Sequence, residues 1–241
     1  MSRSARLGIS LSLLVVSSAC GGNSNADATT QGREPVSQRS PLVDSLRARR
    51  NAALAKRPDT LGMRADSARV LGNASAKVWV IVTSDFQCAQ CRDFAVNVLP
   101  LLRQEFVDTG LVRIAFVNSP QERNFNARFA AHAALCAAAA GRFWEMHDSL
   151  FATQQLWARL TDPRPYMDSL AVAAGVPAEK QADCTARNRM LLRLSSDIEQ
   201  SRTSGATDVP IVFVGDRRLQ RDDLTPSGLR RAILAALDKE Q

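Results

Sequence analysis

Residues 77–91 read KVWVIVTSDFQCAQC, and the predicted fold is built around them. The first part of this stretch, residues 77–83, is a β-branched and aromatic run typical of a buried strand. Its last part places Cys88 and Cys91 two residues apart. Apolar residues then recur at helical spacing over residues 94–106. The two thiols therefore stand where a predicted strand gives way to a predicted helix.

This position suits a redox-active cysteine pair. We expect Cys88 to lie in the first turn of the helix, where unpaired backbone N–H groups and the helix dipole favour a thiolate over a thiol. Cys91 lies one turn later, close enough to attack a mixed disulfide formed at Cys88. The pattern is typical of a thioredoxin-like redox motif.

A zinc site is the main alternative for a pair of cysteines at this spacing. Structural zinc needs four ligands, with a second pair of cysteines or histidines at a similar spacing. The remaining candidates, His132, Cys136, His147 and Cys184, show no such pairing. We therefore expect no metal and no organic cofactor, and we interpret both histidines as packed or polar side chains.

The composition is that of a globular protein. The 241 residues are 45% hydrophobic and 23% charged, which fits one domain with a tail. The net charge of +7 comes from scattered basic residues, and aromatic residues make up only 5%. This pattern does not indicate nucleic-acid binding.

The N-terminus has the features of an export signal. Residues 1–19 combine two arginines with a short apolar run, which predicts a signal peptide. Small residues before Cys20 and glycines after it favour a lipoprotein whose lipid is attached to Cys20. Ordinary cleavage after Ala19 is the alternative. Residues 20–67 then read as a lipid-anchored flexible tether, with a possible short helix over 41–57.

The other cysteines fit an exported chain. Cys88, Cys91, Cys136 and Cys184 are even in number, and four cysteines allow three disulfide pairings. The adjacent pair is the natural redox couple, which leaves Cys136 with Cys184 as a candidate structural bridge.

The rest of the chain predicts an α/β order of elements. A second strand over 111–117 should pair in parallel with the first, because a helix connects them. Helical patterns then fill residues 121–205. A strand over 209–214, a tight turn and a short strand over 217–219 predict a hairpin before a last helix capped by Thr225. The order is βαβ, a helical insertion, then ββα.

Three separated motifs resemble the DsbA-like thiol:disulfide oxidoreductases, and within them the BdbD-like members. The motifs are Asp85-Phe86-Gln87-Cys88-Ala89-Gln90-Cys91, the segment from Ala134-Leu135-Cys136-Ala137 to Gly141-Arg142-Phe143-Trp144-Glu145-Met146-His147-Asp148-Ser149-Leu150-Phe151, and Val209-Pro210 before a strand and hairpin.

The resemblance implies a thioredoxin fold over residues 68–240, with an inserted helical domain at about 121–205. It implies that Cys88 is an exposed nucleophile, that Cys91 is its buried partner and that Pro210 is a cis-proline facing them. Members of the family often carry cysteines at the positions of Cys136 and Cys184, which fits the second bridge.

The resemblance also implies where an extended client peptide would bind. The backbone of the residue before the cis-proline would pair with the peptide like an added strand. The residues expected to contact substrate are Val209, Phe86, Ala89 and Gln90.

Two positions depart from the family pattern. Members commonly have a buried Glu or Asp six residues before the first cysteine, and here that residue is Val82. The dipeptide Ala89-Gln90 lacks the histidine or proline of the strongest oxidants. Because this dipeptide tunes the thiolate, it also tunes the redox potential.

The resulting hypothesis is an exported enzyme that introduces disulfide bonds into client proteins. Its partners would be unfolded or reduced clients and a membrane protein that reoxidises it, and it would work outside the cytoplasm at a membrane surface. One alternative is an extracytoplasmic reductase or isomerase. Another is a non-catalytic lipoprotein that acts as a binding or assembly factor.

Overall fold

The computed structural model describes residues 45, 49, 59–205 and 208–240. Residues 55–241 form one compact unit, and every element from α2 onward belongs to it. The predicted signal peptide, Cys20 and nearly all of the predicted helix over 41–57 lie outside the described residues. None of the helices in the described ranges combines the length and the apolar character needed to span a bilayer.

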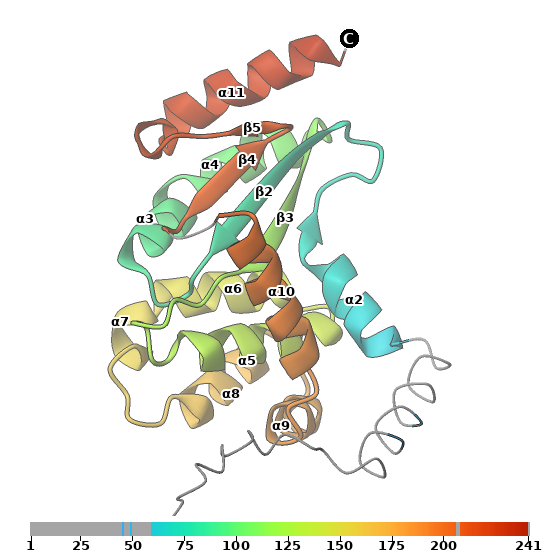
Figure 1. Cartoon of the computed structure of the whole chain (residues 1–241), viewed down its shortest axis with the longest axis vertical. Coiled ribbons are helices and arrows are strands. Elements are labelled where there is room, and N and C mark those ends of the chain that lie inside the picture. Colours follow the sequence, from blue (N-terminus) through green and yellow to red (C-terminus); the bar gives the residue numbers. More distant parts are fainter. Residues whose placement is uncertain (1–44, 46–48, 50–58, 206–207, 241) are drawn as a thin grey trace, which may run out of the picture. The chain divides into compact units, whose positions relative to one another are not determined.

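A mixed sheet of five strands lies at the centre of this unit, in the order β1-β3-β2-β4-β5 (Figure 1). The central pair β2 and β3 is parallel, and the other three pairings are antiparallel. The predicted strands are confirmed to within about two residues. The strands are β1 (Val70–Leu71), β2 (Val78–Ser84), β3 (Val112–Asn118), β4 (Ile211–Val214) and β5 (Arg217–Arg218).

The central strands are apolar because helices cover them. Val80 and Ile114 face each other in the parallel register, and both side chains are completely buried. β-Branched residues fit such a position because their stiff side chains pack well on a pleated surface. The run over 77–83 therefore indicates a buried strand, because its β-branched side chains suit the covered face of a sheet.

The helix after Cys88 is interrupted near Pro100. Helix α3 (Ala89–Asn97) is followed by α4 (Leu99–Leu102) and by a π-helical turn, η1 (Arg103–Val107). Pro100 lies in the first turn of α4. A proline has no backbone N–H to continue the ladder of hydrogen bonds, so the helix restarts there.

Six helices between β3 and β4 form the predicted insertion, and they gather at one end of the sheet (Figure 1). Gly141 ends the first of them with φ of +76°, and the N–H of Arg142 donates to the carbonyl of Ala137. The sequence pattern does not single out the four-residue helix α7. The helices are α5 (Ala127–Ala139), α6 (Phe143–Ala152), α7 (Gln154–Trp157), α8 (Arg164–Ala173), α9 (Ala178–Ala186) and α10 (Leu191–Thr203).

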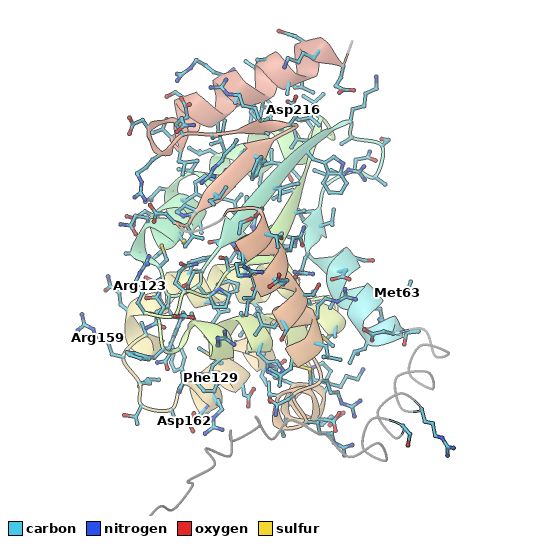
Figure 2. All side chains as sticks on the ribbon, in the orientation of Figure 1. Met63, Arg123, Phe129, Arg159, Asp162 and Asp216 are labelled. Carbon is cyan, nitrogen blue, oxygen red and sulfur yellow. A yellow bond between two sulfur atoms is a disulfide. The ribbon has the colours of Figure 1, made fainter. Side chains whose placement is uncertain are left out.

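The chain ends in the predicted hairpin and helix. Figure 2 shows Asp216 in the turn between β4 and β5, at the end of the sheet away from the insertion. A 3₁₀ turn, η2 (Arg221–Asp223), leads to α11 (Pro226–Lys239). The hydroxyl of Thr225 accepts a hydrogen bond from the N–H of Gly228 at 3.1 Å, as expected of the cap.

Helix α2 (Thr60–Ala68) lies in the segment expected as a tether. It begins after Asp59, whose carboxylate accepts a hydrogen bond from the N–H of Gly62 at 2.9 Å. It packs against α5 and leads into strand β1 at the sheet edge. Its apolar residues Leu61, Ala65 and Ala68 recur at helical spacing and pack against the core. These contacts hold the segment as a helix.

Candidate active site

Cys88 caps the N-terminus of α3. A three-residue turn, Asp85 to Gln87, leads from β2 to this position. The Cys88 sulfur accepts a hydrogen bond from the N–H of Cys91 at 3.3 Å. It therefore takes the place that a serine or aspartate oxygen usually occupies at a helix start. Such a sulfur is stabilised as an anion by the N–H groups of the first turn.

Both thiols are free and little exposed. Cys91 exposes 1% of its surface and Cys88 exposes 5%. The expectation of an exposed Cys88 is therefore wrong for this structure. The physical reason is that the carbonyl oxygen of Val209 and the amide oxygen of Gln90 each lie 3.5 Å from the Cys88 sulfur and cover it.

The pKa values of the two thiols are shifted in opposite directions. The contact with the Cys91 thiol lowers the pKa of Cys88, and the backbone N–H groups of Cys91 and Gln90 add to this effect against burial. Burial raises the pKa of Cys91 well above its ordinary value, and the neighbouring Cys88 raises it further. The first proton lost from the pair therefore comes from Cys88, and a thiol of lowered pKa is suited to act as a nucleophile.

Pro210 lies beside this sulfur. The Val209–Pro210 peptide bond is cis, and it immediately precedes β4. The Cys88 thiol donates to the carbonyl of Val209 across 121 residues of sequence. The fold thus brings together the two most separated parts of the predicted site.

The expected substrate-contacting residues divide into two groups. Ala89 and Gln90 are exposed beside Cys88, whereas Val209 is 1% exposed and meets Cys88 through its backbone carbonyl. Phe86 is 1% exposed, and its ring stacks on Phe116 with 5.2 Å between the ring centroids and packs against Phe151 at 5.0 Å. A client cannot reach this ring, so the expected substrate contact of Phe86 is wrong and the residue belongs to the core.

Three polar residues that the sequence analysis gave no role hold the turn before Cys88. The amide nitrogen of Gln154 donates to the carbonyls of Phe86 at 2.7 Å and Cys88 at 3.0 Å. The amide oxygen of Gln87 accepts from the N–H of Asn126, and the carboxylate of Asp85 accepts from three donors. Asp85 and Gln87 belong to a quoted motif, whereas nothing in the local sequence marks Gln154.

Val82 lies on β2, six residues before Cys88. It exposes 2% of its surface and offers no group that could exchange a proton. The side chain of Ser84 and the backbone N–H of Asp85 are the groups whose hydrogen bonds lower the pKa of Cys91 against its burial. The polar surroundings of Cys91 thus come from the end of β2.

A disulfide joins Cys136 and Cys184, with an S–S distance of 2.03 Å. It connects α5 to α9 within the helical insertion and is the pairing expected beside a redox couple. Both residues are buried.

The histidines are packed side chains, as expected. His147 is 1% exposed among aromatic rings and contacts the Asp148 carboxylate at 2.7 Å. His132 is 8% exposed. In the ranges that the structure describes, no three or more Cys, His, Asp or Glu side chains are grouped so as to hold a metal ion.

The family model described as Thioredoxin matches residues 64–235. The chain belongs to the thioredoxin family. The match spans β1 to the greater part of α11, so it includes the cysteine pair, the helical insertion and Pro210.

Curated relatives of this thioredoxin-family chain include disulfide-forming proteins. The chain is 24% identical over 157 residues to "Disulfide bond formation protein D" of Bacillus subtilis, which covers 61% of this chain and 68% of that protein. It is 34% identical over 88 residues to "Probable disulfide bond formation protein D" of Bacillus anthracis. This match covers 35% of this chain and 40% of that protein.

A relative of another kind is "Na(+)/H(+) antiporter NhaA 3" of Salinispora tropica. It is 32% identical over 154 residues, which are 64% of this chain but 22% of the antiporter. The chain thus spans less than half the length of the first of its curated relatives.

Solved structures share the fold of this thioredoxin-family chain. BdbD from Bacillus subtilis, in its oxidised form, gives a TM-score of 0.62 at 21% identity, with 70% of this chain and 92% of that chain covered. DsbA of Chlamydia trachomatis gives 0.60 at 22% identity, with 71% and 91% covered. The predicted thioredoxin fold with a helical insertion and the resemblance to DsbA-like proteins are both confirmed.

Proposed function

We propose that this protein is an exported thiol:disulfide oxidoreductase that introduces disulfide bonds into client proteins. One observation carries the proposal: the sulfur of Cys88 caps a helix next to cis-Pro210, and its pKa is lowered whereas that of Cys91 is raised. A low-pKa thiol at a helix N-terminus is a good leaving group and a good nucleophile. The disulfide-forming relatives support the same chemistry.

The first step begins with the oxidised protein, in which Cys88 and Cys91 are joined. A client thiolate attacks the sulfur of Cys88, forms a mixed disulfide with it and breaks the Cys88–Cys91 bond. The electron pair of that bond goes to Cys91. Because burial raises the pKa of Cys91, this sulfur takes up a proton rather than remaining a thiolate.

The second step releases the product. A second client thiolate attacks the client sulfur of the mixed disulfide, and Cys88 leaves as a thiolate that its lowered pKa stabilises. Two electrons have then passed from the client to the protein. Of the two client protons, one stays on Cys91 and the other goes to solvent.

The client would lie along the edge formed by Val209 and Pro210. An extended peptide can pair there with the backbone, as peptides do at the exposed edges of sheets. Exposed Ala89 and Gln90 flank the same sulfur. The carbonyl of Val209 must move from the Cys88 thiol, or share it, when a client binds, because it now covers this atom.

The N-terminal sequence supports a site of action outside the cytoplasm. A signal peptide over 1–19, a lipid on Cys20 and a tether to the folded unit would hold the protein at a membrane outside the cytoplasm. There it would meet unfolded clients and a membrane protein that returns it to the oxidised form.

Oxidation of a dithiol peptide by the full mature chain tests the activity. We expect the oxidised protein to form the peptide disulfide, and Cys88→Ser to abolish the reaction. A Cys136→Ser/Cys184→Ser double variant is the control, since it also replaces cysteine by serine but keeps the redox pair. Equal peptide oxidation by the Cys88→Ser protein would contradict the proposal.

The direction of electron flow needs a second measurement, the equilibrium of the pair with glutathione. A potential near about −120 mV marks an oxidase whose reduced form is stabilised, and one near about −270 mV marks a reductase. A pair that resists mild reduction altogether would point to a structural staple in a non-catalytic protein.

A further inference from the structure

Asp85 is a buried carboxylate in the turn between β2 and α3. It exposes 1% of its surface. One oxygen accepts from the N–H of Gln87 at 2.7 Å, and the other accepts from the N–H of Gln121 at 2.8 Å and from the side-chain amide of Asn124 at 2.7 Å. The last two donors come from the loop between β3 and α5.

These partners favour the ionised form of Asp85. All three are donors, whereas a protonated carboxyl group needs an acceptor for its own proton. Burial raises the pKa of Asp85, and the three hydrogen bonds and the charge of Arg123 oppose that rise. Arg123, labelled in Figure 2, lies on the same loop as Gln121 and Asn124.

The carboxylate binds the residue next to Cys88, because one of its oxygens accepts from the N–H of Gln87 at 2.7 Å. The backbone N–H of Cys88 donates to the backbone carbonyl of Asp85 at 3.1 Å, which closes a tight turn. The negative charge of Asp85 raises the pKa of Cys88, against the contacts with Cys91 and Gln90 that lower it. Like charges at short range disfavour each other's ionised form, most strongly when both are buried.

We infer that Asp85 is a positioning residue that holds a fixed negative charge beside Cys88 and makes the redox pair a milder oxidant than its helix N-terminus alone would make it. A thioredoxin-like pair is a strong oxidant when its reduced, thiolate form is stabilised. Asp85 destabilises that thiolate. The effect on the oxidising strength of the pair rests on the proposed function. The effect of the Asp85 charge on the pKa of Cys88 does not.

The test compares Asp85→Asn with Asn124→Ala in the full mature chain. Each variant removes one hydrogen-bonding partner from the same cluster, but only Asp85→Asn removes the charge. The first readout is the pKa of Cys88 in the reduced protein, from the ultraviolet absorbance of its thiolate against pH. The second is the equilibrium constant with glutathione, at a pH above the Cys88 pKa.

We expect Asp85→Asn to lower the Cys88 pKa by about one unit, which is a tenfold change in ionisation. The equilibrium with glutathione should shift by about tenfold toward reduced protein, equivalent to about 30 mV for a two-electron couple. Asn124→Ala should leave the Cys88 pKa near the wild-type value, because the charge remains. An unchanged or higher Cys88 pKa in a folded Asp85→Asn protein overturns the inference.

The new amide of Asp85→Asn faces other donors and could prevent folding. In that case Asp85→Asn/Asn124→Asp serves instead, because it restores a donor–acceptor pair and moves the charge out of the turn. It should also lower the Cys88 pKa, by less than Asp85→Asn, and an unchanged value again overturns the inference. A lowered Cys88 pKa in a protein that oxidises no peptide would support this inference while refuting the proposed function.

Discussion

At the scale of single residues, the expected thiol chemistry depends on the different surroundings that the fold gives Cys88 and Cys91. Cys88 accepts an N–H bond at a helix start, and Cys91 lies one turn deeper with 1% of its surface exposed. The pKa of Cys88 is lowered and that of Cys91 is raised, so the pair loses its first proton at one defined sulfur. An asymmetric pair of this kind suits a disulfide that must be attacked at one end.

Cys91→Ala tests the largest contribution to the acidity of Cys88. Because the contact with the Cys91 thiol is the first cause of the lowered pKa, its loss should raise the Cys88 pKa. The rate of Cys88 alkylation against pH reports this value. Cys91→Ser is the matched control and should raise it less, because a hydroxyl also donates. Equal pKa values in the Cys91→Ala and wild-type proteins would contradict the expectation.

The stability of the reduced protein should depend on pH through Cys88. Between the lowered pKa of the folded state and the ordinary pKa of a cysteine, the unfolded chain holds a proton that the folded chain has lost. The free energy of unfolding should therefore rise with pH in this window, with a slope of up to about 1.4 kcal/mol per pH unit. Denaturant unfolding of reduced protein at several pH values measures the slope, and Cys88→Ser should remove it.

At the scale of elements, a buried ion pair joins the helical insertion to the sheet. Asp197 on α10 accepts from the guanidinium of Arg69 at 2.5 Å and from the side-chain amide of Asn118 at 2.7 Å. Arg69 follows α2, and Asn118 ends β3. Three elements that are distant in sequence thus meet at one carboxylate. The turn before Cys88 is held in a similar way by Gln154 at the start of α7.

Asp197→Ala should weaken this junction strongly. It leaves the buried Arg69 without this carboxylate, and breaking a buried pair costs about 3–5 kcal/mol. Chemical denaturation measures the loss. Glu199→Ala is the matched control, because it removes a carboxylate from the same helix that pairs with Arg202 in full exposure to solvent. Its unfolding midpoint should stay close to that of the wild type, and equal losses in the two variants would contradict the prediction.

At the scale of the whole molecule, the redox site and the stabilising disulfide are separate. The Cys136–Cys184 bond joins α5 to α9. Cys88 belongs to the βαβ part of the thioredoxin fold, and its partner Val209 lies just before β4, the strand that follows the insertion. The two sulfur pairs therefore serve different parts of the fold, and changes at one should leave the other intact.

Removal of the disulfide by Cys136→Ala/Cys184→Ala should lower stability without altering the site. The bond closes a loop of 48 residues, for which the chain-entropy estimate is about 4 kcal/mol. We expect a loss of about 2–4 kcal/mol in denaturant unfolding of the oxidised protein and an unchanged Cys88 pKa. A shifted Cys88 pKa would show that the two pairs are not independent. Stability equal to that of the wild type would show that the disulfide does not stabilise the fold.

Much of the fold could be predicted because local sequence and burial agree. The run over 77–83 is apolar since helices cover both central strands, and Pro100, Gly141 and Thr225 act through the backbone geometry of their own turns. Helix α2 lies in the segment expected as a tether, and its packing against α5 supplies the contacts that hold it as a helix. The wrong substrate contact of Phe86 has a similar origin, since its burial depends on Phe116 and Phe151.

The sequence alone predicts the order βαβ, helical insertion, ββα, the spacing of Cys88 and Cys91, and the family, because each shows in short runs of neighbouring residues. Only the tertiary structure decided how deeply Cys88 is buried, which carboxylate lies beside it and which helix holds its carbonyl. The physical reason is that solvent exposure, charge proximity and hydrogen-bond partners depend on distances in space. In this protein such contacts join residues as far apart as Cys88 and Val209, 121 positions, and Arg69 and Asp197, 128 positions.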